Sequence, residues 1–137
     1  MTTLLLDASV LLAALDPEDD HHQPARALLE DEEATLATLD LARYEVANVA
    51  VRAWRAPEKV ARLLAVIERL ADDGGVLPST DTLLTKATEI AEHHTISVYD
   101  AAYAAAAKEA GHRLVSCDAR DLVSKGLAAL PASANPA

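Results

Sequence analysis

Several residue types are scarce in this 137-residue chain, and each scarcity excludes a class of structure or site. The single cysteine, Cys117, excludes an internal disulfide and is typical of a reducing cytoplasm. With only four glycines, the chain has no G-x-G-x-x-G or G-K-[ST] phosphate-binding loop. No apolar run approaches the ~18 residues of a membrane span, and the N-terminus lacks the basic segment of a signal peptide. We therefore expect a cytoplasmic protein without a membrane-spanning helix.

Aromatic residues are also few, since the chain has no Phe and one Trp, although 51% of its residues are hydrophobic. The apolar residues are mostly Ala, Leu and Val, which favours close-packed helices over a β-sandwich. The length fits one domain with a substantial core. We expect this domain to span residues 1–130, followed by a frayed Ala- and Pro-rich tail over residues 131–137.

Zinc ligands with the usual spacing are missing as well. The histidines form two adjacent pairs, His21-His22 and His93-His94, rather than the i, i+4 pairs of a helical zinc site. We expect all four to be exposed in loops or at helix ends.

The net charge is −10, and a strongly acidic chain should repel nucleic acid, because phosphate binding depends on Lys and Arg. The basic residues are unevenly distributed, however. Six of the twelve lie between positions 43 and 69: Arg43, Arg52, Arg55, Lys59, Arg62 and Arg69. This segment is either a solvated helix face with internal ion pairs or a local basic strip on an acidic body.

Short apolar runs alternate with helical patterns along the chain. The predicted strands are residues 3–6, 34–39, 76–78 and 112–116. The predicted helices are residues 8–15, 24–33, 40–56, a segment after Pro57, 82–93, 97–110 and 118–125, with Asp40 as an N-cap and Gly111 as a C-cap. This alternation predicts an α/β fold in which a mostly parallel sheet of four to five short strands is covered on both faces.

Acidic residues follow the predicted strands. Asp7 directly follows the first strand, and Asp118 follows the last, with Asp121 one helical turn later. Glu45 and Asp100 lie near the starts of helices. In an open parallel sheet the functional crevice lies outside the carboxyl ends of the strands, so these carboxylates should converge. Converging carboxylates repel one another unless a hard cation such as Mg²⁺ or Mn²⁺ compensates their charge.

Helix capping is the alternative explanation for most of these acids. Asp7 and Asp118 could be ordinary N-caps, and Ser97 with Asp100 fits a capping box. Glu45 lies past the first turn of its helix and between apolar residues, so capping does not explain it. The helical pair Tyr99 and Tyr103 is interpreted as packing or a dimer surface rather than as a base-stacking platform.

Four segments, in their order and spacing, resemble PIN-domain ribonucleases, specifically the VapC-type toxins of bacterial toxin–antitoxin pairs. These segments are LLLDASVLLAAL, ARYEVANVAVRAW, SVYDAAYAAAAKEAG and HRLVSCDARDL. The resemblance implies a PIN-like three-layer α/β/α sandwich. It also implies a set of metal-binding, catalytic acids: Asp7, Glu45, Asp100 and Asp118. Asp121 would be an auxiliary catalytic acid, with Ser9 and Ser116 as auxiliary polar groups.

The resemblance further implies a Mg²⁺- or Mn²⁺-dependent endoribonuclease that acts on RNA, pairs with a cognate VapB-type antitoxin and forms a homodimer. Within the basic strip, Arg43, Arg52 and Arg55 are the candidates for RNA contacts. Two positions depart mildly from the family pattern, because Ala8 and Ser116 stand where Thr is common. Neither departure removes a carboxylate.

Two other functions remain open at this point. A PIN scaffold could serve as a non-catalytic binding module, although such a module would not need mutually repelling carboxylates. A receiver-type phosphoacceptor domain has a similar size and an acidic pocket, but it would place a Lys after its fifth strand, and no Lys follows a strand here.

Overall fold

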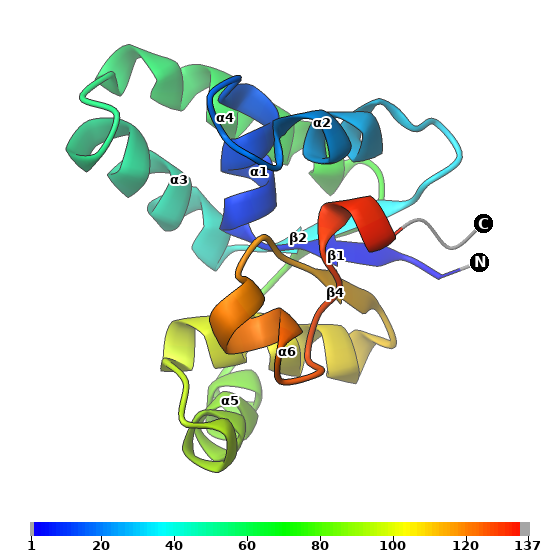
Figure 1. Ribbon diagram of the computed structural model, residues 1–137. Coiled ribbons are helices and arrows are strands. Elements are labelled where there is room, and N and C mark those ends of the chain that lie inside the picture. The colour runs from blue at the N-terminus through cyan, green and yellow to red at the C-terminus, as the bar shows by residue number, and fades with distance from the viewer. Residues whose placement is uncertain (1, 135–137) are drawn as a thin grey trace.

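The structure is a computed structural model that describes residues 2–134 (Figure 1). Four strands form one parallel sheet in the order β3-β2-β1-β4: β1 (Leu4–Leu6), β2 (Leu36–Leu39), β3 (Gly75–Leu77) and β4 (Arg113–Val115). The central strand β1 pairs with both β2 and β4, with Leu5 opposite Ala37 on one side and Leu114 on the other. The parallel sheet and the strand count confirm the predicted α/β class.

Helices cover both faces of this sheet (Figure 1). One layer contains α1 (Ala8–Leu15), α2 (His22–Glu30), α3 (Leu41–Arg52) and α4 (Val60–Ala71), and the other contains α5 (Asp81–His94) and α6 (Val98–Ala110). Short 3₁₀ turns occupy Pro57–Lys59 and Pro131–Ser133, and a π-helical turn occupies Ala119–Val123. This is the three-layer α/β/α sandwich that the sequence predicts. Within residues 2–134, no helix has the length and apolarity to cross a membrane.

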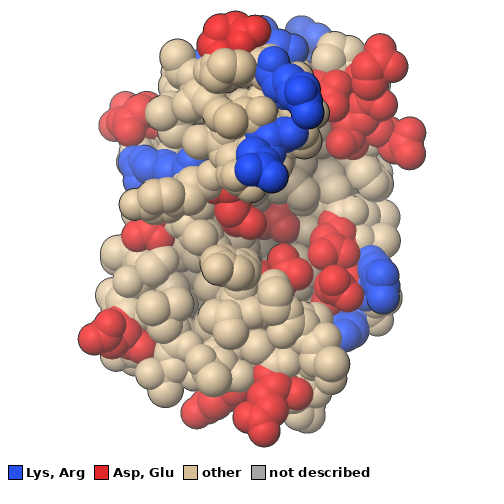
Figure 2. Space-filling view, turned by 90° about the vertical axis from the view of Figure 1, so that its left-hand side faces the viewer, with Lys and Arg blue, Asp and Glu red and all other residues tan. Residues whose placement is uncertain are grey.

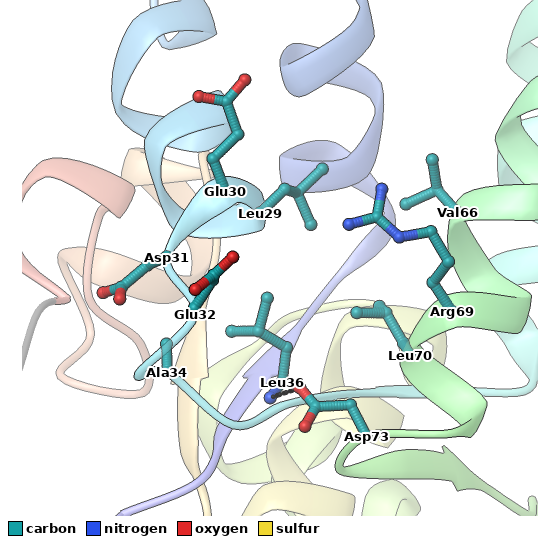
Figure 3. Close-up of a pocket in the computed structure, with 10 residues that line it drawn as sticks. All are labelled: Leu29, Glu30, Asp31, Glu32, Ala34, Leu36, Val66, Arg69, Leu70 and Asp73. Atoms are coloured by element: carbon teal, nitrogen blue, oxygen red, sulfur yellow. Dashed lines mark hydrogen bonds between the residues drawn. The ribbon is translucent and has the colours of Figure 1, made fainter.

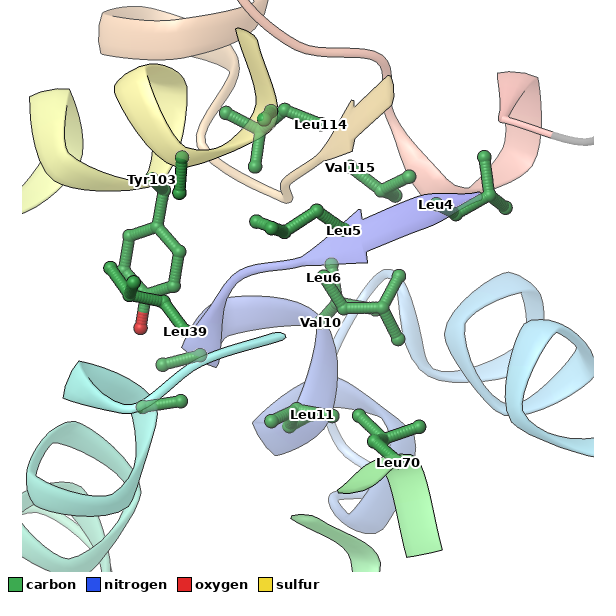
Figure 4. Close-up of a cluster of buried hydrophobic side chains, with 14 of the residues drawn as sticks. Leu4, Leu5, Leu6, Val10, Leu11, Leu39, Leu70, Tyr103, Leu114 and Val115 are labelled. Atoms are coloured by element: carbon green, nitrogen blue, oxygen red, sulfur yellow. The ribbon is translucent and has the colours of Figure 1, made fainter. Parts of the chain in front are cut away.

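The core lies on both sides of β1 (Figure 4). Every residue of β1 is at most 1% exposed, which explains why its sequence is a continuous apolar run without polar alternation. In α6, alanines at 101, 102 and 104–107 are all buried, so this helix packs closely against β4 and α5. Close packing of small side chains accounts for a core that contains no Phe.

Some predicted boundaries and caps are wrong. The helix predicted over residues 40–56 ends at Arg52, because Arg55 adopts a left-handed φ of 54° shortly before Pro57. Asp40 does not cap α3 with its side chain. Its carboxylate accepts hydrogen bonds from the backbone N–H (3.0 Å) and the hydroxyl of Ser79, so it ties the end of β2 to the loop after β3.

One further expectation needs correction. His22 is buried rather than exposed, and its Nδ1 lies 2.8 Å from the carbonyl oxygen of Ala13, where it joins α2 to α1. In the tail that the sequence predicts to fray from residue 131, Pro131 and Ala134 are buried. Residues 135–137 lie outside the described part of the chain.

Candidate metal centre

Asp7 stands where β1 ends and α1 begins. Its Oδ1 accepts hydrogen bonds from the backbone N–H groups of Ser9 (3.0 Å) and Val10 (3.4 Å), so it is the N-cap of α1. The side chain is nevertheless buried, at 5% exposure. Burial raises the pKa of Asp7 to about 6, against the lowering effect of hydrogen bonds from Ser116, Ser9 and Val10. Asp7 therefore caps α1 and also carries a buried carboxylate whose ionisation costs free energy.

Ser9 and Ser116 connect the ends of β1 and β4. The Ser9 hydroxyl donates to Asp7 and accepts from the backbone N–H of Cys117 at 2.9 Å. The Ser116 hydroxyl accepts from the backbone N–H of Asp118 at 3.0 Å and lies 3.4 Å from Ser9 Oγ. These contacts fix the backbone around Asp7 and Asp118.

Three acids form the tightest group at the carboxyl edge. Asp100, Asp118 and Asp121 each present a carboxylate oxygen, and these oxygens all lie within 4.8 Å of one another. Asp100 lies in the first turn of α6, and its backbone N–H donates to the capping Ser97 at 3.0 Å. Asp118 accepts from the backbone N–H of Asp121 at 2.9 Å and so starts the π-helical turn. Burial raises the pKa of Asp100, and the negative charges of Asp118 and Asp121 raise it further.

Glu45 links this group to Asp7. It lies in the second turn of α3, and its Oε1 accepts a hydrogen bond from the hydroxyl of Tyr103 at 2.6 Å. Its pKa is raised by burial and by the charge of Asp100, and Glu45 in turn raises the pKa of Asp7. The five acids therefore form one continuous, mutually repelling set that runs from Asp7 to Asp121.

The protein supplies almost no positive charge to this set. Among residues 2–134, the one ion pair that any of the five acids makes is between Arg120 and Asp121, at 4.0 Å, and the Arg120 side chain is 94% exposed. The donor set contains only oxygen, which suits a hard divalent cation such as Mg²⁺ or Mn²⁺. The residues present therefore fit a metal centre.

The observed grouping differs in one respect from the grouping implied by the resemblance. Asp121, expected to be auxiliary, belongs to the tight group, whereas Asp7 and Glu45 lie outside it. Tyr103, interpreted from the sequence as packing or a dimer surface, also bonds to Glu45, which the sequence did not indicate. The available signal was its position three residues after Asp100, which places both side chains on the same face of α6.

The view onto the carboxyl edge shows acidic side chains around a hollow, with Lys and Arg side chains above it (Figure 2). Of the predicted RNA contacts, Arg43 is paired with Glu68 at 3.3 Å, while Arg52 and Arg55 are exposed at the end of α3. The segment between residues 43 and 69 thus contains an internal ion pair, as the first interpretation expects, and exposed arginines, as the second expects.

A separate hollow of about 410 Å³ lies between α2 and α4 (Figure 3). Leu29, Leu36, Val66 and Leu70 line it together with Arg69, and none of the five acids does. It is therefore not part of the candidate metal centre.

The PIN-domain family profile matches residues 4–125. The chain belongs to the PIN-domain family. Ribonuclease VapC3 of Pyrobaculum aerophilum is 37% identical to this PIN domain over 125 residues, which cover 89% of this chain and 93% of the relative.

Solved structures share the PIN fold. Mycobacterium tuberculosis VapC20, described as a Sarcin-Ricin loop cleaving toxin, has a TM-score of 0.76 at 20% identity and covers 90% of this chain and 95% of its own. A chain of a toxin–antitoxin complex from Klebsiella pneumoniae has a TM-score of 0.69 at 14% identity, covering 94% and 98%. The receiver alternative is wrong, because receiver domains have the strand order 2-1-3-4-5 whereas this sheet has 3-2-1-4.

Proposed function

We propose that this PIN domain is a metal-dependent endoribonuclease and the toxin of a toxin–antitoxin pair. The observation that carries the proposal is the group formed by Asp100, Asp118 and Asp121. Among residues 2–134, the one basic side chain that pairs with this group is the exposed Arg120, at 4.0 Å. The chain is also 37% identical to a named ribonuclease. Asp7, Glu45, Asp100 and Asp118 would hold the ion. When bound, Mg²⁺ or Mn²⁺ lowers the pKa of a coordinated water and offsets charge on the scissile phosphate.

Proton transfer requires a carboxylate oxygen that is not already engaged. Asp118 uses Oδ1 to accept from the backbone N–H of Asp121, and its other oxygen is the one left to hold the ion. Asp121 has only the long pair with Arg120, whose side chain is almost fully exposed. We therefore favour Asp121 over Asp118 as the group that accepts a proton from the attacking water. Arg52 and Arg55, which are exposed, would contact RNA phosphates at the edge of the site.

The purified protein is expected to cut RNA in the presence of Mn²⁺ or Mg²⁺, to stop when EDTA is added, and to recover when Mn²⁺ exceeds the chelator. The physical reason is that the clustered carboxylates cannot organise the attack on a phosphate without a compensating cation. Gel analysis of a labelled RNA measures the rate. Asp118→Asn protein purified in parallel controls for contaminating ribonuclease, and cutting that EDTA leaves unchanged would contradict the proposal.

A non-catalytic PIN scaffold is the remaining alternative. The raised pKa values of Asp7, Glu45 and Asp100 count against it, because burial and mutual repulsion of carboxylates cost stability. A binding module would gain nothing in return for this cost.

We further propose that the chain acts in the cytoplasm and is held inactive by a cognate VapB-type antitoxin. The support is that chains of its fold occur in toxin–antitoxin complexes such as the one from Klebsiella pneumoniae. Expression of the protein alone is expected to arrest growth, and co-expression of a small protein encoded beside it should restore growth. Colony counts after induction measure both effects. Harmless expression of a demonstrably active nuclease would contradict the toxin role.

A further inference from the structure

Tyr103 is a buried hydroxyl among the acids whose role the proposed chemistry leaves open. It is 2% exposed and lies one helical turn after Asp100 on α6. Its ring packs among the leucines of the core, and its oxygen points away from α6, the helix that carries it (Figure 4). The hydroxyl donates to Glu45 Oε1 at 2.6 Å, which joins α6 to α3 across the edge of the sheet.

The same hydroxyl also contacts the segment that carries Asp7. The Asp7 carboxylate accepts from the N–H groups of Ser9 and Val10, and the backbone of Ala8 and the charge of Asp7 both act on the pKa of the Tyr103 hydroxyl. The proton of this hydroxyl is directed to Glu45 Oε1. One hydroxyl therefore joins the helices that bear Glu45 and Asp100 beside the segment that bears Asp7.

Glu45 needs such a contact more than the other acids do. Asp7, Asp100 and Asp118 have short side chains at the ends of strands or the starts of helices, where capping bonds fix the local backbone. Glu45 has a longer side chain in the second turn of α3, and its hydrogen bond to Tyr103 is what fixes Oε1. With Oε1 held, Oε2 is the oxygen left for a ligand.

We propose that Tyr103 is a positioning residue that holds the Glu45 carboxylate in place for the divalent cation. The inference rests on the proposed metal centre and deepens it. Groups that hydrogen-bond a metal-ligating carboxylate orient it, and their loss typically weakens metal affinity about 10- to 100-fold. A hydroxyl that merely satisfied its own hydrogen bond inside the core would affect stability and leave metal affinity unchanged.

The test measures Mn²⁺ binding to the RNA-free protein by electron paramagnetic resonance of the free ion. Tyr103→Phe keeps the ring and removes the hydroxyl, and the expected result is a Kd for Mn²⁺ raised about 10-fold or more. Glu45→Asp keeps the charge but shortens the side chain by one methylene, out of reach of Tyr103, and should weaken binding similarly. Tyr99→Phe, on the same helix but 64% exposed, is the matched control and should bind like wild type.

The double variant decides whether Tyr103 acts through Glu45. In the Glu45→Asp background, Tyr103→Phe should produce no further loss of Mn²⁺ affinity. Additive losses, or a Tyr103→Phe protein that binds Mn²⁺ as wild type does, would overturn the inference. A wild-type protein that binds no Mn²⁺ would overturn the proposed metal centre itself, so the two failures are distinguishable.

Discussion

The Asp118→Asn variant is expected to cut RNA at roughly a hundredth of the wild-type rate or less, while it keeps its fold. Asp118 shares the tightest carboxylate group with Asp100 and Asp121, so the change removes one charge from the centre of the site. Loss of an outer hydrogen-bond partner already costs about 10- to 100-fold, so loss of a ligand should cost at least as much. The Asn oxygen can still accept from the backbone N–H of Asp121, which preserves the local turn.

Asp20→Asn is the matched control for this variant, because it makes the same chemical change at an exposed position. Labelled RNA, saturating Mn²⁺ and equal protein concentrations give the comparison, and thermal unfolding verifies that both variants fold. Wild-type activity in folded Asp118→Asn protein would show that Asp118 is not a catalytic residue.

Asp7→Asn is expected to abolish cutting and, without metal, to stabilise the protein at neutral pH. The folded-state pKa of Asp7 is about 6, against 3.8 for an unperturbed Asp. Because the pKa of Asp7 is higher in the folded than in the unfolded protein, protonated Asp7 adds to the free energy of unfolding. This contribution is complete below about pH 4 and is lost as the pH rises through 6. The difference of roughly two pKa units corresponds to about 3 kcal/mol.

The asparagine should recover most of this loss, because it is neutral and can still accept from the N–H groups of Ser9 and Val10. In EDTA at pH 7.5, the free energy of unfolding of Asp7→Asn is therefore expected to exceed that of wild type by about 2–3 kcal/mol. The excess should shrink as the pH falls from 6 towards 4. Denaturant unfolding at several pH values measures it. A metal-free Asp7→Asn protein less stable than wild type at pH 7.5 would show that Asp7 serves mainly as a cap.

The sequence predicted the sheet edge well because local patterns determine it. The unbroken apolar run of β1 required a strand buried on both faces, and a parallel sheet then placed Asp7 and Asp118 at the same edge. Ser97 and Gly111 bounded α6 as predicted, since caps depend on neighbouring residues.

Contacts between distant segments were the part that could not be predicted. Asp40 looked like an N-cap, but its carboxylate bonds to Ser79, 39 residues away. The bond between Tyr103 and Glu45 spans 58 residues. The turn after β4 is also π-helical rather than the regular helix expected over residues 118–125. No local pattern encodes these pairings.

Mn²⁺ binding by wild-type and Asp118→Asn proteins, titrated side by side by electron paramagnetic resonance, tests the central claim most directly. The claim is that the acids at the carboxyl edge share a cation. It predicts that the wild-type protein binds Mn²⁺ and that the same concentrations of Asp118→Asn protein leave the ion free. Equal binding by both proteins, or none by either, would contradict it.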